Sequence, residues 1–228
     1  MSTRAPFLQE YTQEDDVKPR RPIPHIFSPF WHGTDSNYET TNRDIRAMIS
    51  KPLSGDEQRT ADSGGGYVYV FCLPVDEAVS PPTRHVKIGM TTRSVPDRMR
   101  RIASACRYEP SAVCSVSTRY PLRVERLCHA QLRGRRRRES PSCPGCGRAH
   151  REWFEVGPPE AERVVCFWSE WMEHTEPYNE GTGELKSEWS ERLGEVQVCD
   201  EPSRCWGLFC NDADVMMRGR VAKHETTV

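Results

Sequence analysis

Residues 67–73 have the sequence YVYVFCL, and residues 85–90 have the sequence HVKIGM. The first segment is continuous, aromatic and β-branched, which is typical of a buried strand. A proline-rich turn separates the two segments, so we expect them to pair as the strands of a hairpin. The run of glycines at 64–66 punctuates the chain before the first strand and marks a domain boundary.

The segments after this hairpin alternate between helix and strand patterns. Ser94 offers an N-cap, and apolar residues then recur every three or four positions, which predicts an amphipathic helix. Four further segments are predicted as strand, helix, strand and helix, in that order: 112–120, 121–132, 152–156 and the residues from 158 onward. We therefore expect an α/β (α+β) fold, in which helices flank one small central sheet.

Composition favours one folded core with long, poorly ordered flanks. Hydrophobic residues make up 36% of the chain and the mean hydropathy is -0.74, which is low for a chain packed throughout. We expect a disordered or linker segment at 1–63, a folded domain at 64–174 with a Cys-containing insertion at 133–150, and an acidic tail at 175–228.

The flanks contain a few segments with a pattern of their own. Residues 20–30 are rich in proline and aromatics and suit an extended linker or docking motif, while residues 42–49 suit two helical turns. One helix is expected at 184–196. Nearby aromatic side chains either pack on the domain or bind a protein partner: Trp189, Trp206 and Phe209.

Charge is unevenly distributed along the chain. Residues 64–172 carry a net charge of +7, whereas residues 1–63 carry -2 and residues 173–228 carry -6. A basic domain is the electrostatic pattern expected for a phosphate-bearing partner such as DNA, although a solvated charged surface is an equally simple account.

Other sequence features bear on location. No run of 18 apolar residues exists and the N-terminus has no apolar h-region, so we expect no membrane segment and no secretory signal. The ten cysteines are then interpreted in a reducing, intracellular compartment, where clusters favour metal binding or burial over disulfides.

The two strand segments carry a family resemblance. Residues 66–70 (GYVYV) and 87–91 (KIGMT) resemble the paired strands that name the GIY-YIG nuclease superfamily. Arg98 and Glu125 lie where that superfamily has its helix arginine and metal-binding glutamate, and residues 150–154 (HREWF) complete the set. The combination is most similar to the bacteriophage-type branch of DNA-binding domains, which also occurs in fungal proteins.

The resemblance implies a site that engages a phosphodiester, although Lys87 replaces the tyrosine of the second motif. Glu125 would hold Mg²⁺ or Mn²⁺, because a carboxylate plus substrate phosphate suits a hard cation that keeps its waters. Arg98 would offer a planar fork to phosphate oxygens. The Tyr69 hydroxyl would orient or deprotonate the attacking water, with Lys87 lowering its pKa.

His129 follows Glu125 by one helical turn, so both side chains project from one face of the predicted helix. The imidazole is a candidate for taking or relaying a proton. Such a pair is also common as a solvated pair on a helix surface. Glu152, next to the final aromatic motif, is a further candidate for the same site.

A second group of residues suits a metal. Cys143, Cys146 and His150 form a C-x-x-C knuckle with a nearby histidine, and structural Zn²⁺ requires four N or S ligands. We choose Cys106, at the end of the first predicted helix, as the fourth ligand, and Cys128 as the second choice. The alternative is a loop with free cysteines.

Five arginines lie within residues 133–138, just before this knuckle. They suit phosphate binding, a short nuclear localisation signal or a solvated tail. The candidate nucleic-acid contacts are Arg93, Arg101, Arg135, Arg136, Arg137 and Arg138.

Three functions fit this sequence. The first is a metal-dependent DNA endonuclease-like domain that uses Tyr69, Arg98 and Glu125. The second is a DNA-binding module of the same fold without catalysis. The third is a zinc-stabilised protein-interaction domain that binds its partner through the aromatic flanks.

Overall fold

The computed structural model describes residues 23–30, 37–74, 84–196 and 202–210. Its six-stranded sheet is antiparallel and has the order β1-β5-β6-β3-β2-β4. The strands are Phe27–Pro29 (β1), Gly66–Cys72 (β2), Val86–Thr91 (β3), Ser111–Thr118 (β4), Arg136–Glu139 (β5) and Trp153–Phe154 (β6). The helices are Tyr38–Ser50 (α1), Gly55–Asp62 (α2), Val95–Cys106 (α3), Pro121–Gln131 (α4), Pro158–Thr175 (α5), Ser187–Glu195 (α6) and Pro202–Cys210 (α7). The predicted α+β class is confirmed.

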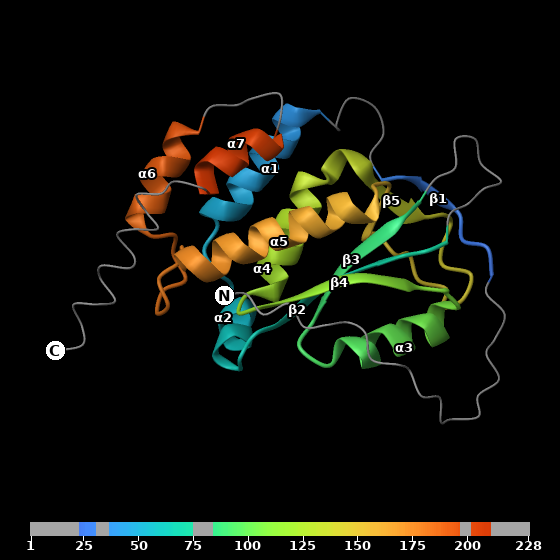
Figure 1. The fold of residues 1–228 in the computed structure, drawn as a ribbon. Coiled ribbons are helices and arrows are strands. Elements are labelled where there is room, and N and C mark those ends of the chain that lie inside the picture. The colour runs from blue at the N-terminus through green and yellow to red at the C-terminus, as the bar shows by residue number, and fades with distance from the viewer. Residues whose placement is uncertain (1–22, 31–36, 75–83, 197–201, 211–228) are drawn as a thin grey trace.

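The sheet separates two hydrophobic cores. Helices α4 and α5 lie over one face and α3 lies over the other (Figure 1). Because successive side chains of a strand point to opposite faces, Val68 and Val70 enter the core under α4 and α5, whereas Tyr69 and Phe71 enter the core under α3. The alternation in β2 therefore decides which functional side chains share a face.

Most predicted elements lie where the sequence placed them, but β5 was not predicted. It lies inside the basic insertion and pairs with both β1 and β6. An arginine run has no apolar alternation that would indicate a strand. In the structure Arg137 pairs with Glu155, and the Arg136 guanidinium lies 4.4 Å from the centre of the Phe30 ring.

The described part of the N-terminal flank, which was expected to be a disordered or linker segment, contains β1 and the helices α1 and α2. Helices α1 and α2 begin at side-chain caps, Asn37 and Ser54, each of which accepts a backbone N–H of the first turn. Ile45 and Ile49 of α1 are fully buried in the larger core. The interpretation of residues 42–49 as helical turns agrees with α1, while residues 20–22 of the proline-rich stretch lie outside the described residues.

A buried ion pair joins this flank to α4. Arg123 of α4 is fully buried, and its Nε and Nη2 atoms donate to the two carboxylate oxygens of Glu57 at 2.9 and 3.2 Å. The same guanidinium donates to the carbonyl oxygens of Lys51 (2.8 Å) and Pro52 (3.0 Å). One guanidinium thus provides hydrogen bonds to the carbonyl oxygens between α1 and α2, which would otherwise be left unpaired at the end of a helix.

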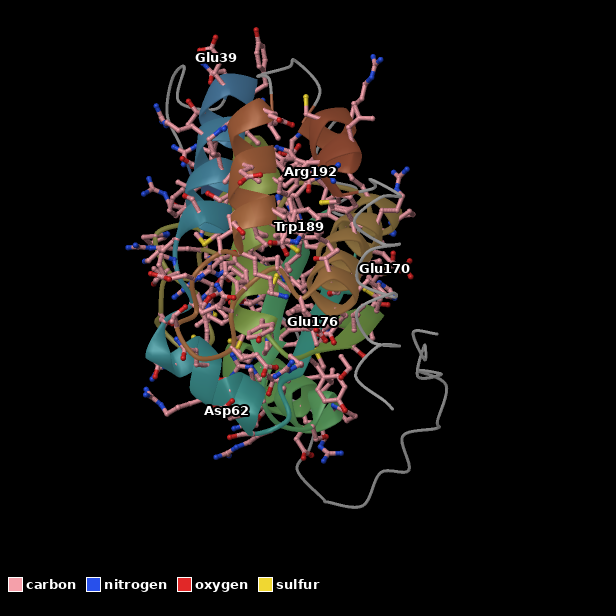
Figure 2. All side chains as sticks on the ribbon, turned by 90° about the vertical axis from the view of Figure 1, so that its left-hand side faces the viewer. Glu39, Asp62, Glu170, Glu176, Trp189 and Arg192 are labelled. Atoms are coloured by element: carbon pink, nitrogen blue, oxygen red, sulfur yellow. The ribbon has the colours of Figure 1, made fainter. Side chains whose placement is uncertain are left out.

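The C-terminal flank buries its aromatic residues in the same core. Trp189, Trp206 and Phe209 are 1–3% exposed and pack against Trp168 and Trp171 of α5. Figure 2 shows Trp189 among α5, α6 and α7. Of the two alternatives for these three residues, the structure selects packing on the domain. The rest of the expected tail, residues 211–228, lies outside the described residues.

Candidate active site and metal centre

Tyr69 and Arg98 are in direct contact on the α3 side of the sheet. The N-cap Ser94 and the first-turn Pro96 start α3 so that Arg98 faces the sheet, and its Nε–H donates to the Tyr69 hydroxyl oxygen at 3.2 Å. Within the described residues nothing accepts the Tyr69 hydroxyl hydrogen, and nothing binds the terminal nitrogens of Arg98. Three donor groups are therefore available to an anionic oxygen.

Gly89 explains how the tyrosine ring reaches this position. Tyr69 and Gly89 are directly opposite each other in the β2–β3 ladder. A Cβ atom added to Gly89 would come within 2.6 Å of the Tyr69 hydroxyl oxygen. The glycine of the KIGM segment is thus required because the ring lies across the backbone of β3.

Two residues of α4, Glu125 and His129, bind the second half of β3, which pairs with β2 along one edge but has no strand along its other edge. β6 pairs with β3 only at Val86 and Lys87, and the last bond of this pairing is Ile88 N–H to Glu152 O, at 3.3 Å. Beyond this point the Met90 N–H donates to the Glu125 carboxylate, and His129 Nε2 lies 3.1 Å from the Ile88 carbonyl oxygen. The predicted Glu125–His129 pair therefore faces a strand edge, not solvent.

The two glutamates near this edge have opposite pKa shifts. Burial and the charge of Glu152 raise the pKa of Glu125 to about 7. Burial also opposes ionisation of Glu152, but Lys87, with its Nζ 2.9 Å from the carboxylate, brings the pKa of Glu152 below its ordinary value. Because its pKa is near neutral pH, Glu125 is the carboxyl whose ionisation would respond most to a cation or phosphate bound nearby.

The electrostatic environment of Tyr69 differs from the expectation. Burial raises the pKa of the Tyr69 phenol, and the nearby cation that opposes this shift is Arg98. Lys87, which was expected to lower the pKa of Tyr69, is instead paired with Glu152 and lies 5.6 Å from the Trp153 ring centre. In this structure the Tyr69 hydroxyl oxygen accepts the Arg98 Nε–H, and the expected role of Tyr69 toward the attacking water stays a prediction.

His129 is a half-buried, neutral side chain. Burial and the charge of Arg136 lower the pKa of His129 to about 4. Its ring packs on Phe154 with 5.0 Å between ring centres. Because a carbonyl oxygen only accepts, the bond to Ile88 requires a hydrogen on Nε2. His129 thus holds α4 against β3, and its role in proton transfer stays a prediction.

The candidate nucleic-acid arginines are on different surfaces. Arg93 is exposed just before α3, Arg101 is exposed within α3 one turn after Arg98, and Arg135 is exposed before β5. Arg136 is half-buried and donates to the Arg151 carbonyl at 2.7 Å. Arg138 is exposed, with Nε 3.5 Å from the Ser28 hydroxyl. The arginine run is thus part of a paired strand, and nuclear location stays a prediction.

The four predicted zinc ligands come together in the structure. The ligand atoms of Cys106, Cys143, Cys146 and His150 all lie within 4.8 Å of one another. Cys106 Sγ is 3.8 Å from Cys146 Sγ, and His150 Nε2 is 3.3 and 3.2 Å from these two sulfurs. A tetrahedron with bonds of ~2.3 Å to sulfur and ~2.05 Å to nitrogen has edges of ~3.8 and ~3.6 Å, so the donor set fits Zn²⁺.

Local packing explains why Cys106 belongs to this group. A Cβ atom on Gly145 would lie 2.3 Å from the Cys106 carbonyl oxygen, so glycine allows the knuckle to lie against the end of α3. Gly147 N–H donates to the Cys143 carbonyl at 2.8 Å and closes the knuckle. The second choice, Cys128, is fully buried under α5, where its thiol lies 3.9 Å from the Val164 carbonyl.

A carboxylate behind the cluster was not predicted. Glu139 is 1% exposed, receives the Tyr108 hydroxyl at 2.6 Å and lies 2.6 Å from His25 Nδ1. It is also 3.8 Å from His150 Nε2. These residues come from separate segments, and the sequence indicates only that Glu139 ends the arginine run.

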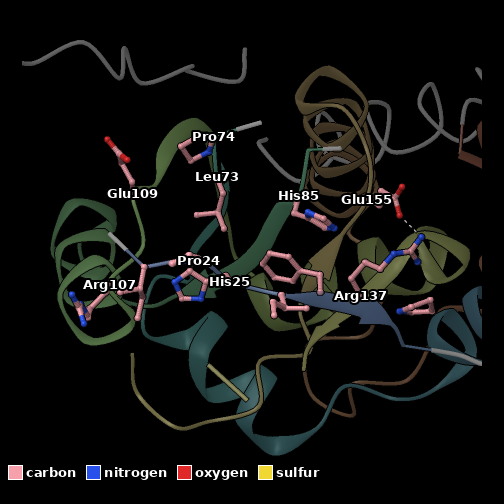
Figure 3. Close-up of a pocket in the computed structure, with 13 residues that line it drawn as sticks. Pro24, His25, Leu73, Pro74, His85, Arg107, Glu109, Arg137 and Glu155 are labelled. Carbon is pink, nitrogen blue, oxygen red and sulfur yellow. Dashed lines mark hydrogen bonds and ion pairs between the residues drawn. The ribbon is translucent and has the colours of Figure 1, made fainter. Parts of the chain in front are cut away.

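A pocket lies beside His25, the residue that contacts the Glu139 carboxylate. It has a volume of about 800 Å³ and lies among β1, the end of β2 and the residues after α3 (Figure 3). His25, Leu73 and Arg107 are among its lining residues, but none of the predicted catalytic residues lines it. This pocket is therefore separate from the Tyr69–Arg98 contact.

The match to a protein family covers the part of the chain that contains both groups of residues. Residues 66–169 match the T5orf172 domain. The T5orf172 match includes Tyr69, Arg98, Glu125 and the Cys/His cluster, whereas α1, α2, α6 and α7 lie outside it. No curated protein and no solved structure matches the chain. In the described part of the chain, every helix is too short or too polar to cross a membrane.

Proposed function

We propose that residues 66–169 form a DNA-binding, nuclease-like module of the GIY-YIG type. The T5orf172 match supports this assignment for the region as a whole. The observation that carries it is the Tyr69–Arg98 contact, because the two side chains bind each other and leave three donor groups directed to an anion. Phosphoryl oxygens are the anionic group that a planar guanidinium binds best.

The second part of the proposal is phosphodiester hydrolysis. Burial in the electrostatic field of Glu152 makes Glu125 costly to ionise, and a divalent cation beside both carboxylates would remove that cost. Their oxygen atoms suit Mg²⁺ or Mn²⁺, which would supply an activated water and neutralise developing charge.

The chain's own residues then have distinct roles. Arg98 binds the phosphate and neutralises charge that develops on its oxygens. Tyr69 donates its hydroxyl hydrogen to a phosphate oxygen or orients the attacking water. Lys87 fixes the Glu152 carboxylate at 2.9 Å, and His129 fixes α4 against the Ile88 carbonyl.

The alternative is the same DNA-binding module without cleavage. It is favoured by the raised pKa of Tyr69, which leaves the site without a phenolate base, and by Lys87 in place of the second tyrosine. Binding would then depend on Arg98 and the exposed arginines, and not on Glu125.

One experiment separates the two functions. Plasmid and branched DNA are incubated with Mg²⁺ or Mn²⁺ and wild-type protein, the Glu125→Gln variant or the Glu170→Gln variant. Glu170 is an exposed residue of α5 and serves as the matched control. Hydrolysis predicts cutting by wild type and Glu170→Gln only. Salt-sensitive binding without cutting selects the alternative, and no DNA binding rejects both.

We further propose that the Cys106, Cys143, Cys146 and His150 cluster holds a structural zinc ion. The distances among the donor atoms and the closure of the knuckle support it. Zinc would fix the insertion to the end of α3 and thereby place Glu152, two residues after His150, next to Lys87.

A further inference from the structure

A basic pocket lies between α1 and α4, on the side of the sheet away from α3. It has a volume of about 430 Å³. Apolar side chains of both helices form part of its wall, and its charged lining residues are Asp44, Lys51, Arg126, Arg133 and Arg136. Four cations and one anion thus surround a space large enough for a phosphate group and part of a sugar.

The positive charge of this pocket is only partly neutralised. Asp44 forms an ion pair with Arg133, with 2.6 Å between Oδ2 and Nη1. Arg126 lies 3.4 Å from Glu57, but that carboxylate already accepts two bonds from the buried Arg123. The Lys51 ammonium has no partner among the described residues. The excess charge belongs mainly to Lys51 and Arg126.

Arg136 and His129 connect this pocket to the candidate active site. Arg136 lines the pocket, and its guanidinium also lies within the electrostatic influence of Glu125 and Glu152. His129 lines the pocket as well, while its Nε2 binds the Ile88 carbonyl of β3. The carboxylate pair therefore acts electrostatically on a residue that lines the basic pocket.

We propose that this pocket binds a phosphate group of a nucleic-acid strand, a different one from the phosphate that Tyr69 and Arg98 engage. The strand part of this proposal rests on the proposed function, whereas the anion-binding pocket does not. Helix α1 lies outside residues 66–169, so Lys51 gives the T5orf172 region a contact that the matched segment lacks. Arg136 links the pocket to the carboxylates, because it lines the pocket and lies within the electrostatic influence of Glu125 and Glu152.

The test uses the full chain without divalent cations, so that cleavage plays no part. The side-chain NMR signals of His129 report on the pocket, and those of the exposed His174 on α5 serve as the internal control. Three probes are titrated: inorganic phosphate, a short 5′-phosphorylated single-stranded oligonucleotide and the same oligonucleotide without its terminal phosphate. We expect His129 to shift with both oligonucleotides, while His174 stays unchanged.

Two variants remove the excess charge, Lys51→Ala and Arg126→Gln, and Arg163→Gln on the exposed side of α5 is the matched control. Each pocket variant is expected to weaken oligonucleotide binding roughly 3- to 10-fold and to reduce the salt dependence by about one counterion. The control is expected to bind as wild type does. Circular dichroism confirms that each variant is folded.

Each outcome decides the proposal. Pocket variants that bind both oligonucleotides as tightly as wild type overturn it, and so does a His129 signal that no probe moves. A shift with inorganic phosphate alone also overturns it, because the pocket then takes free phosphate and no strand. Cleavage plays no part in these measurements, so a failure of Glu125-dependent hydrolysis leaves the result for this pocket intact.

Discussion

The Tyr69 ring lies across Gly89, so that a Cβ atom at residue 89 would meet the tyrosine hydroxyl oxygen at 2.6 Å. The hydroxyl that contacts Arg98 is therefore positioned by a residue with no side chain. This relationship joins the two strands at the centre of the sheet to the first turns of α3.

The first prediction concerns this contact. Gly89→Ala should push the Tyr69 ring away from Arg98 and lower the free energy of unfolding by ~1–3 kcal/mol through overpacking. DNA binding or cleavage should fall with it. Gly194→Ala is the control, because no atom lies within 4 Å of the added Cβ on the exposed side of α6. That change should leave stability equal or raise it by ~0.5–1 kcal/mol, as measured by urea unfolding.

The second prediction isolates the Tyr69 hydroxyl. Tyr69→Phe keeps the ring that fills the core under α3 and removes only the hydroxyl, which accepts the Arg98 Nε–H, so stability should change by about 1 kcal/mol or less. Activity on DNA, either cutting or binding, should fall by about tenfold. Tyr67→Phe is the matched control, since Tyr67 is 38% exposed on the same strand. Equal activity for the two variants would remove Tyr69 from the site.

The third prediction concerns zinc. Purified protein should contain about one equivalent of zinc by elemental analysis, because the four donors fit a closed tetrahedral site. Cys143→Ser should lower this content and the Tm, whereas Cys166→Ser, outside the cluster, should retain the metal. Protein stripped of metal that melts at the same temperature would contradict a structural role.

The fourth prediction concerns the buried Arg123–Glu57 pair. Arg123→Met should cost ~3–5 kcal/mol of stability, because it removes the buried cation that pairs with the buried Glu57 carboxylate and leaves it only Ser54 and the more distant Arg126. The double variant Arg123→Met with Glu57→Leu should recover much of this loss, since it removes both charges. Urea unfolding at neutral pH measures both values, and a double variant no more stable than the single one would contradict this explanation.

The same pair predicts a pH dependence. Burial opposes ionisation of Glu57, but its bonds with Arg123 and Ser54 outweigh burial and lower its pKa below 4.5. A carboxyl with a lowered folded-state pKa stabilises the fold above the unfolded value, and this contribution disappears as the pH falls through the folded value. Wild-type stability should therefore fall on acidification below about pH 4.5, and this slope should be smaller for Glu57→Gln.

Much of the fold follows from local patterns in the sequence. The continuous aromatic and β-branched run at 67–73, the Ser94 cap and the prolines at the starts of α4 and α5 all act on neighbouring residues, so they predict strands and helices directly. Strand β5 escaped prediction because its pairing depends on β1 and β6, which are distant in the chain. The helices of the N-terminal flank depend on packing in the larger core and on bonds with Arg123, which is more than 60 residues away from Glu57.

The sequence by itself determined which chemical groups are available: a phenol, a guanidinium and a carboxylate on successive elements, and three cysteines and a histidine with ligand spacing. Only the tertiary structure decided their partners. It placed Arg98 beside Tyr69, paired Lys87 with Glu152, and buried the aromatic residues of the C-terminal flank. Charge and burial act through space, so pKa values and contacts depend on elements that local sequence patterns do not bring together.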